Sequence, residues 1–299
     1  MNMLTPAELT ESYTMIGRVK AEKPFGRLFV LAVMAGLFIA LGAAVCNTAA
    51  HSIADVSTGK IISGLLFPFG LAMVMLMGAE LFTGNVMIGI SVLNGDTTLW
   101  KMLRNWGVVY LGNFAGAALL ALACARFGQL GYSQGYLAAY TIKLAAAKCS
   151  LPFANALVMG ILCNILVCTG VLCSISAKDT AGRILGAYVP VSFFVICGFE
   201  HSVANMYYIP AGLFAMQVPE YAELAAKVGL DVSALNWGNF LVGNLLPVTI
   251  GNILGGLAVG IAMWACHVKK TPAANVCLPG EHNISPQPEV KKTMQRKGW

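Results

Sequence analysis

Charged residues are scarce in this sequence. Of its 299 residues only 11% are Asp, Glu, Lys or Arg, whereas an ordinary soluble domain has about 25%. Hydrophobic residues make up 58% of the chain, and the mean hydropathy is +0.72. Such a composition cannot cover a soluble fold with polar surface, which excludes a soluble enzyme, a disordered chain and a nucleic-acid binder. The sequence therefore predicts an integral membrane protein.

Other patterns are also missing. The 32 glycines have no three-residue period, which excludes collagen. The nine cysteines include no Cys-x-x-Cys pair, and Cys163, Cys168 and Cys173 are five residues apart, so they do not share one helix face. We interpret the cysteines as small buried apolar residues and expect neither a metal site nor a cofactor. Residues 1–27 hold seven charged side chains without an apolar run, so no signal peptide is predicted.

Long runs without charge indicate helical spans, each of which needs roughly 20 apolar residues. These runs do not alternate as the roughly ten-residue strands of an outer-membrane barrel do. Two long apolar stretches, 61–95 and 184–219, are interrupted by a single acid, Glu80 and Glu200. We predict one broken helix in each, because non-helical backbone is tolerated at membrane depth where it is packed in protein or lines a cavity. The predicted fold is all-α with six spans, at 28–52, 60–95, 104–127, 151–177, 184–215 and 235–266.

The basic residues predict the orientation. An even number of spans places both ends on one side, and cytoplasmic loops carry the excess of Lys and Arg. The side of the two ends has fourteen such residues and the opposite side has five: Lys60, Arg126, Lys143, Lys148 and Lys227. Both termini are therefore predicted to be cytoplasmic, in a multi-pass protein of the cytoplasmic (inner) membrane.

The sequence repeats itself weakly. The segment Gly78 to Asn85 matches Gly198 to Asn205, 120 residues later, and Asn105-Trp106-Gly107 matches Asn236-Trp237-Gly238, 131 residues later. Three spans then match three spans in opposite topology, which predicts a three-plus-three inverted repeat with segments 2 and 5 broken at the midplane. Such repeats place a permeation pathway at their interface.

Three parts of the chain are expected. Residues 1–27 form a cytoplasmic amphipathic arm, whose segment Thr5-Pro6-Ala7-Glu8 is a capping box with proline at the first helical position. This arm either lies on the membrane surface or covers the pore mouth. Residues 28–266 form the six-span channel domain, and residues 267–299 form a polar cytoplasmic tail that is predicted to be disordered.

Ionisable groups inside spans are costly and therefore mark functional candidates. His201 is the strongest, because it lies at the second break and its pKa is nearest to physiological pH. A histidine satisfied by a neighbouring carbonyl is the alternative. For Glu80 and Glu200 we favour a structural role, as protonated groups or as acceptors for backbone N–H groups at the breaks. Asn164 is an amide inside the fourth span and fits either a pore site or a hydrogen bond between helices.

The motifs resemble the formate/nitrite transporter family over roughly residues 5–268. Gly198-Phe-Glu-His-Ser is the most specific match, and Glu80-Leu-Phe-Thr, Gly160 to Asn164 and Asn244 to Asn252 follow in order. The resemblance implies an aquaporin-like fold, a homopentamer with one pore per protomer, and small monovalent anions as permeants. The whole chain is most similar to the hydrosulfide-channel branch of that family.

The resemblance also implies site residues. His201 faces Thr83 at a central pore site with Asn164 nearby, Lys148 attracts anions at the outer vestibule, and apolar constrictions flank the site. By motif alignment the outer constriction consists of Phe67 and Phe194 and the inner one of Leu71 and Leu81, while Glu80, Glu200, Asn85 and Asn205 support the helix breaks. The sequence Gly84-Asn85 departs from relatives that carry small hydroxyl residues there.

The predicted function is therefore a channel for small monovalent anions, hydrosulfide first, with selectivity from apolar constrictions around a central histidine. The first alternative is a formate or nitrite channel or proton-coupled transporter of the same family. A second alternative is a neutral-solute pore of the water or glycerol type, although such pores typically use an arginine and no arginine lies in the interior of a predicted span, Arg104 and Arg126 being at the ends of the third. A membrane enzyme would need a nucleophile–base pair or a metal cluster, which the sequence does not supply.

Overall fold

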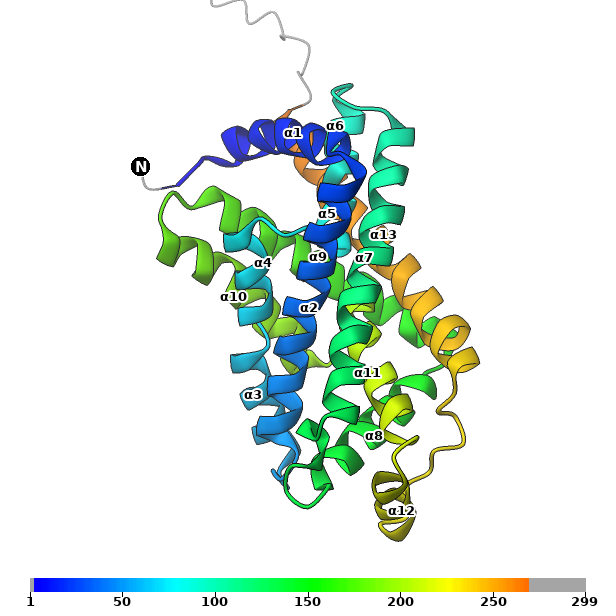
Figure 1. Ribbon diagram of the computed structural model, residues 1–299. Coiled ribbons are helices and arrows are strands. Elements are labelled where there is room, and N and C mark those ends of the chain that lie inside the picture. The colour runs from blue at the N-terminus through cyan, green and yellow to red at the C-terminus, as the bar shows by residue number, and fades with distance from the viewer. Residues whose placement is uncertain (1–2, 269–299) are drawn as a thin grey trace, which may run out of the picture. The chain divides into compact units, whose positions relative to one another are not determined.

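The computed structural model describes residues 3–268, and every regular element in that range is helical (Figure 1). The predicted disorder of the tail falls on residues 269–299, which lie outside the described residues. The elements, in chain order, are α1 (Pro6–Glu22), α2 (Phe25–Ala50), α3 (Val56–Leu66), α4 (Phe69–Met77), α5 (Phe82–Asn85), η1 (Val86–Ile88), α6 (Gly89–Leu93), α7 (Leu99–Arg126), η2 (Gln129–Gly131), α8 (Tyr136–Cys149), α9 (Phe153–Ser176), α10 (Thr180–Cys197), α11 (Ser202–Ala215), α12 (Pro219–Lys227), the π-helix η3 (Asn239–Leu245) and α13 (Leu246–His267).

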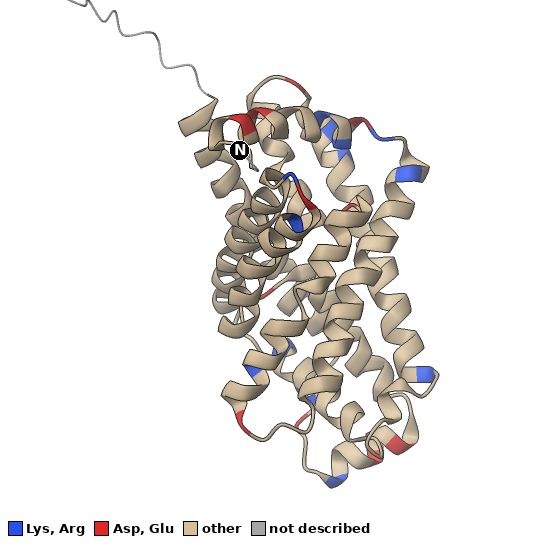
Figure 2. Ribbon diagram, turned by 90° about the vertical axis from the view of Figure 1, so that its left-hand side faces the viewer, with Lys and Arg blue, Asp and Glu red and all other residues tan. Residues whose placement is uncertain are grey.

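Six helical segments of the described chain are long and apolar enough to cross a membrane, which confirms the predicted all-α membrane class. Figure 2 shows the charged residues gathered toward two ends, with few between them. Many large apolar side chains on these helices are exposed in the single chain, as expected of a surface that contacts lipid or another protomer. The segments are Phe25–Ala50, Val56–Met77, Leu99–Arg126, Phe153–Ser176, Thr180–Cys197 and Asn239–His267.

The long helices pack in two pairs. Helix α2 packs along α7, and helix α9 packs along α13 (Figure 1). Small residues make this close packing possible: a Cβ atom on Gly116 would collide with the carbonyl of Val33, and one on Gly255 with the carbonyl of Ile161. Helix α11 lies against α7, α8 and α2.

The backbone leaves the helix at two related places. Helix α4 ends at Gly78 and helix α10 ends at Gly198, each glycine in the left-handed conformation, with φ of 63° and 71°. Such a φ strains any residue with a side chain, so glycine is the residue that fits this helix end. A few non-helical residues follow each glycine before α5 begins at Phe82 and α11 begins at Ser202.

The amino-terminal helix α1 is packed against the protein. The predicted capping box is present: Glu8 N–H donates to Thr5 Oγ1 and Thr5 N–H donates to Glu8 Oε2. Tyr13 is fully buried, and its hydroxyl donates to the Gly84 carbonyl at 3.1 Å. Helix α1 contacts α6, α7 and α13 and thus lies over the region of the first break.

Two helices were not expected from the sequence. Helix α8 lies between the third and fourth apolar segments and carries Lys143 and Lys148, while α12 precedes the sixth segment. Both are short, and polar residues interrupt their apolar runs, so neither looks like a span. Helix α8 packs on α11 and thereby brings Lys148 next to the second break.

Candidate functional site

The structure brings Thr83 and His201 together from the starts of α5 and α11. Thr83 Oγ1 lies 2.9 Å from His201 Nε2, and both side chains are buried. His201 is the N-cap of α11, and its Nδ1 accepts the Ala204 N–H at 3.1 Å. A neutral imidazole with Nδ1 as acceptor carries its proton on Nε2. His201 therefore donates to the Thr83 oxygen, and the hydroxyl hydrogen of Thr83 is left for another acceptor.

Aromatic rings lie on one side of this pair. The Phe194 ring stacks on the His201 ring at 5.8 Å between centroids, and the Phe67 ring meets Phe194 edge-on at 5.6 Å. A cavity of about 590 Å³ reaches from these three side chains outward to Lys60 on α3 and Lys148 on α8. The predicted outer constriction thus lies at the inner end of an open vestibule.

A second, smaller cavity lies on the other side of the pair. It measures about 40 Å³ and is lined by Leu71 and Leu81, the predicted inner constriction, together with Tyr13 and Lys20 of α1. Leu71 and Leu81 are buried, at 2% and 3% exposure. Through Tyr13 and Lys20, helix α1 therefore forms part of the wall of this second cavity.

Asn164 makes no hydrogen bond with His201 in the described part of the chain. Its Nδ2 donates to the Thr83 carbonyl at 3.2 Å and to the Asn252 carbonyl at 2.5 Å, which joins α9 to α5 and α13. Cys168, one turn further along α9, donates its thiol to the same Thr83 carbonyl at 3.5 Å. Asn164 Oδ1 is buried and has no hydrogen-bond partner among the described residues. Asn164 thus makes hydrogen bonds between helices, as the second of the two expectations has it, and its role as a pore site stays a prediction.

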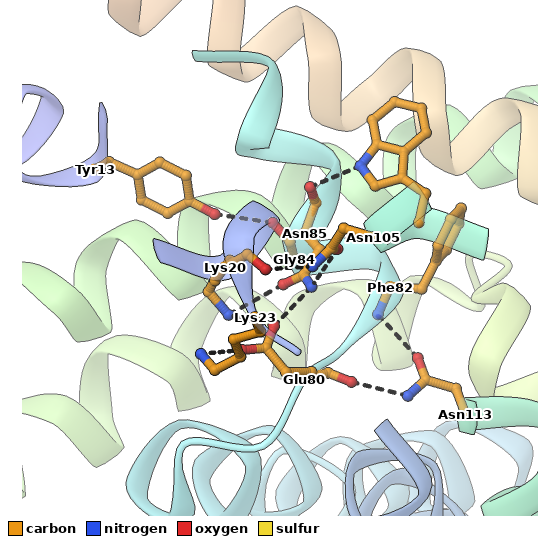
Figure 3. Close-up of polar contacts among 10 residues, drawn as sticks. Tyr13, Lys20, Lys23, Glu80, Phe82, Gly84, Asn85, Asn105 and Asn113 are labelled. Atoms are coloured by element: carbon orange, nitrogen blue, oxygen red, sulfur yellow. Dashed lines mark hydrogen bonds and ion pairs between the residues drawn. The ribbon is translucent and has the colours of Figure 1, made fainter. Parts of the chain in front are cut away.

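Glu80, at the first break, is held by two lysines of the amino-terminal arm (Figure 3). Lys20 Nζ lies 2.9 Å from Glu80 Oε2 and Lys23 Nζ lies 2.8 Å from Oε1. Asn85 Nδ2 donates to the same carboxylate at 2.7 Å and to Asn105 Oδ1 at 2.9 Å. Asn105 in turn donates to the Lys20 carbonyl, which fixes α1 to this network.

Glu200, at the second break, has a matching network with one lysine. Lys148 Nζ lies 2.7 Å from Glu200 Oε1. Asn205 Nδ2 donates to Glu200 Oε2 at 2.6 Å and to Asn244 Oδ1 at 2.7 Å, and Asn244 donates to the Lys148 carbonyl. The two networks therefore share the same order of partners: lysine, glutamate and two asparagines.

The freed backbone groups at the breaks are satisfied by two further asparagines. Asn113 donates to the Ala32 and Glu80 carbonyls and accepts the Phe82 N–H. Asn252 does the same with the Gly160 and Glu200 carbonyls and the Ser202 N–H. Each amide side chain takes the place of the hydrogen bonds that the interrupted helix would have made.

These contacts correct two expectations. The carboxylates of Glu80 and Glu200 accept from side chains rather than from backbone N–H groups, because lysines and asparagines reach them first. The register of the second repeat match was also wrong. By their contacts, Asn105 corresponds to Asn244 and Asn113 to Asn252, an offset of 139 rather than 131 residues.

Sequence reasoning gave no site role to Lys20, Lys23, Asn113 or Asn252. One signal could have found the two asparagines: Gly112-Asn113-Phe-Ala-Gly116 and Gly251-Asn252-Ile-Leu-Gly255 share the pattern Gly-Asn-x-x-Gly. The lysines gave no such signal, because their partner Glu80 lies about 60 residues further along the chain.

Asp55 places a negative charge at the mouth of the vestibule. It caps α3, and two hydrogen bonds from Thr58, one from its hydroxyl and one from its N–H, lower the pKa of the Asp55 carboxyl below its ordinary value. The group is therefore ionised at neutral pH. The other acidic side chain that lines this cavity is Glu200, which is already paired.

Comparison with known proteins gives a consistent result. The family model described as "Formate/nitrite transporter" matches residues 7–265. The formate channel FocA of Haemophilus influenzae is 35% identical over 272 residues, which cover 90% of this chain and 95% of that protein. The formate channel FocA of Escherichia coli K12 is 34% identical over 274 residues, covering 90% and 96%.

Solved structures show the same similarity. A structure described as a pentameric formate channel with formate bound matches at 32% identity with a TM-score of 0.72, over 82% of this chain and 98% of that one. A structure described as an FNT family ion channel matches at 27% identity with a TM-score of 0.69, over 87% and 98%.

Proposed function

Because the chain belongs to the formate/nitrite transporter family, we propose that it forms a membrane channel for small monovalent anions. The observation that carries the proposal is the buried Thr83–His201 pair, which lies between two cavities and beside apolar side chains from both halves of the chain. An anion would enter the vestibule, pass Phe67 and Phe194, reach this pair and leave past Leu71 and Leu81.

The physics of such a path follows from its lining. Apolar rings exclude water and make a bare charge costly. Hydrogen-bond donors at the centre replace part of the lost hydration. The free hydroxyl hydrogen of Thr83 is such a donor, and His201 orients it by donating to the same oxygen. If the anion is the conjugate base of a weak acid, taking up a proton at this point would let the neutral acid pass the second constriction at low cost.

In this proposal His201 orients the permeant and is not itself the proton donor. Nδ1 is occupied by the Ala204 N–H, so a proton added there would remove the cap of α11. The neutral ring holds its single proton on Nε2, and losing it would leave an imidazolate, so a proton that the permeant takes up would come from water in the vestibule while Thr83 and His201 hold the anion by hydrogen bonds. A pure anion channel needs no such step, and the two modes differ in whether protons move with the anion.

For the architecture we propose two inverted repeats of three spans, with the second and fifth spans broken. The matched networks at Glu80 and Glu200 and the matched glycines 116 and 255 support this proposal. A homopentamer is supported by the similar structure described as pentameric. The excess of lysine and arginine supports a cytoplasmic location for α1, as well as an inner-membrane location with both termini in the cytoplasm.

For the permeant we propose formate, because curated relatives that match most of the chain are named as formate channels. Hydrosulfide, which the sequence ranked first, stays a prediction, as does nitrite. The neutral-solute pore is less favoured, since the vestibule is lined by three lysines.

The proposal is tested by flux into liposomes that hold the purified protein. We expect formate to enter faster than glycerol, and His201→Ala to change the pH dependence of formate flux. Hydrosulfide and nitrite, measured in the same vesicles, rank the anions. Glycerol flux equal to formate flux, or anion flux indifferent to His201, would contradict the proposed site.

A second expectation concerns Thr83. Thr83→Val keeps the shape of the side chain but removes the hydroxyl that donates to the anion. A hydrogen bond to a charged group contributes about 1.5–3 kcal/mol, so we expect formate flux to fall roughly 10- to 100-fold. Thr83→Ser should retain most of it. Thr169→Val is the matched control, because the Thr169 hydroxyl donates only to the Ile165 carbonyl within α9. Full flux in Thr83→Val would remove the hydroxyl from the mechanism.

A further inference from the structure

The vestibule lysine closest to the central site is already neutralised. Lys148 Nζ lies 2.7 Å from Glu200 Oε1, and the two side chains are only 13% and 5% exposed. Its ammonium also lies 5.5 Å from the Tyr208 ring centroid, and Asn205 binds the other carboxylate oxygen. The Lys148–Glu200 pair has no net charge, and Tyr208 and Asn205 surround it. Lys148 is therefore poorly suited to attract a passing anion.

Lys60 is different. It lies on α3, lines the same cavity, and makes no ion pair or side-chain hydrogen bond with any residue of 3–268. Phe67 follows it by seven residues, which places both on one face of the span, about 10 Å apart along the axis. Its ammonium lies close to Gly198, where a Cβ atom would be 3.1 Å from Nζ, and Gly198 precedes the Glu200–His201 segment.

The lysines at the first break, near Glu80, differ from those near Glu200. There, both nearby lysines, Lys20 and Lys23, bind Glu80 at 2.9 and 2.8 Å. At Glu200 one lysine binds the carboxylate, and the second, Lys60, leaves its ammonium to the cavity. Each break thus has one more nearby lysine than carboxylates, but only at the second break is one of these lysines not bonded to the carboxylate.

We propose that Lys60 is the residue that attracts and first holds the permeating anion in the vestibule, and that Lys148 is a positioning residue for Glu200. This inference rests on the proposed anion-channel function. Besides Glu200 and His201, the other acidic, lysine and histidine side chains that line the cavity are His51, Asp55 and Lys143. Asp55 is ionised and tied to Thr58, and Lys143 is an exposed residue of α8.

The two roles predict different kinetics. A cation that concentrates anions at the mouth changes the half-saturating concentration and leaves the maximal flux unchanged, and its effect decreases with ionic strength. For Lys60→Gln we therefore expect the half-saturating formate concentration to rise roughly tenfold at low salt, with maximal flux close to wild type. Lys60→Arg should stay near wild type.

Two control variants distinguish an effect specific to Lys60 from an effect of the total surface charge. Lys143→Gln removes a cation from the same cavity, and Lys227→Gln removes one from α12, which does not line it. Both should leave the half-saturating concentration nearly unchanged. An equal increase in Lys143→Gln would mean that the vestibule acts through its summed charge, and it would overturn the assignment to Lys60.

Charge rescue gives an independent measurement. Lys60→Cys is treated with aminoethyl methanethiosulfonate, which restores a positive charge, or with sulfonatoethyl methanethiosulfonate, which adds a negative one. We expect the first reagent to restore wild-type saturation and the second to worsen it, and wild type treated in the same way controls for the native cysteines. Equal effects of both reagents, or wild-type saturation in Lys60→Gln, would overturn the proposal. Absence of anion flux in the wild type would instead overturn the proposed function.

Discussion

Replacing Lys148 with methionine is expected to destabilise the protein by about 3–5 kcal/mol, because it leaves the Glu200 carboxylate buried and without its counter-ion. Lys148 and Glu200 are 13% and 5% exposed, so little water can replace the lost ammonium. The loss should appear as a lower midpoint of unfolding during SDS titration in mixed micelles. Lys227→Met, an exposed lysine at the end of α12, is the control and should change the midpoint little.

The double variant Lys148→Met/Glu200→Gln identifies the cause. Glutamine removes the charge and retains an amide that can still pair with Asn205 and Asn244, the remaining partners of Glu200. We expect the double variant to recover most of the stability lost by Lys148→Met alone. If it is as unstable as the single variant, packing of the lysine stem rather than the unpaired carboxylate explains the loss.

Replacing Asn252 with leucine is expected to have a comparable effect, for a different reason. Its amide satisfies three buried backbone groups: the carbonyls of Gly160 and Glu200 and the N–H of Ser202. Each buried group left without a partner costs about 1–3 kcal/mol, so the total loss for the three groups is about 3–9 kcal/mol. Asn113→Leu should behave similarly, since Asn113 makes the equivalent three hydrogen bonds at the first break.

Two further variants test that interpretation. Asn252→Asp keeps the shape and the acceptor for Ser202 but turns an oxygen toward two carbonyls, so it should be at least as unstable as leucine. Asn236→Ala changes an exposed asparagine that caps the Asn239 N–H and should cost about 1 kcal/mol. A stable, folded Asn252→Asp would show that the hydrogen-bond donors of Asn252 contribute little.

The six apolar segments could be predicted from the sequence because a membrane-spanning helix requires a simple and recognisable sequence pattern. A helix exposed to lipid needs about 20 apolar residues, and few other features of this chain produce such runs. The boundaries agree within a few residues for the first, third and fourth segments. Helices α8 and α12 are not marked by a long apolar run in the sequence. Their length is set by packing against the rest of the protein rather than by the thickness of the membrane.

The contacts of the site were predictable only in part. Thr83 and His201 were paired by resemblance and lie 2.9 Å apart. The Asn-Trp-Gly match misled the register, because Trp106 donates to the Asn85 carbonyl, whereas Trp237 packs between Phe214 and Phe240. Two similar tripeptides thus have unrelated surroundings, and only the hydrogen bonds of the neighbouring asparagines show which residues correspond.

The partners of Glu80 could not be derived from a local pattern. Lys20 and Lys23 belong to an arm whose sequence has the pattern of an amphipathic surface helix, with charged side chains expected to face water. Their side chains reach the first break only because α1 lies against the protein, as the buried Tyr13 indicates. The partner that a long, flexible lysine side chain binds cannot be derived from the residues next to it in the sequence.

The two break networks also bear on how the chain folds as it is synthesised. Among the described residues, every hydrogen-bond partner of Glu80 lies between residues 20 and 113, and every hydrogen-bond partner of Glu200 lies between residues 148 and 252. The first network can therefore close while the second half is still on the ribosome. The hydrogen bond from His201 to Thr83 joins the two halves of the chain. The central site therefore forms last, from two halves that have already folded separately.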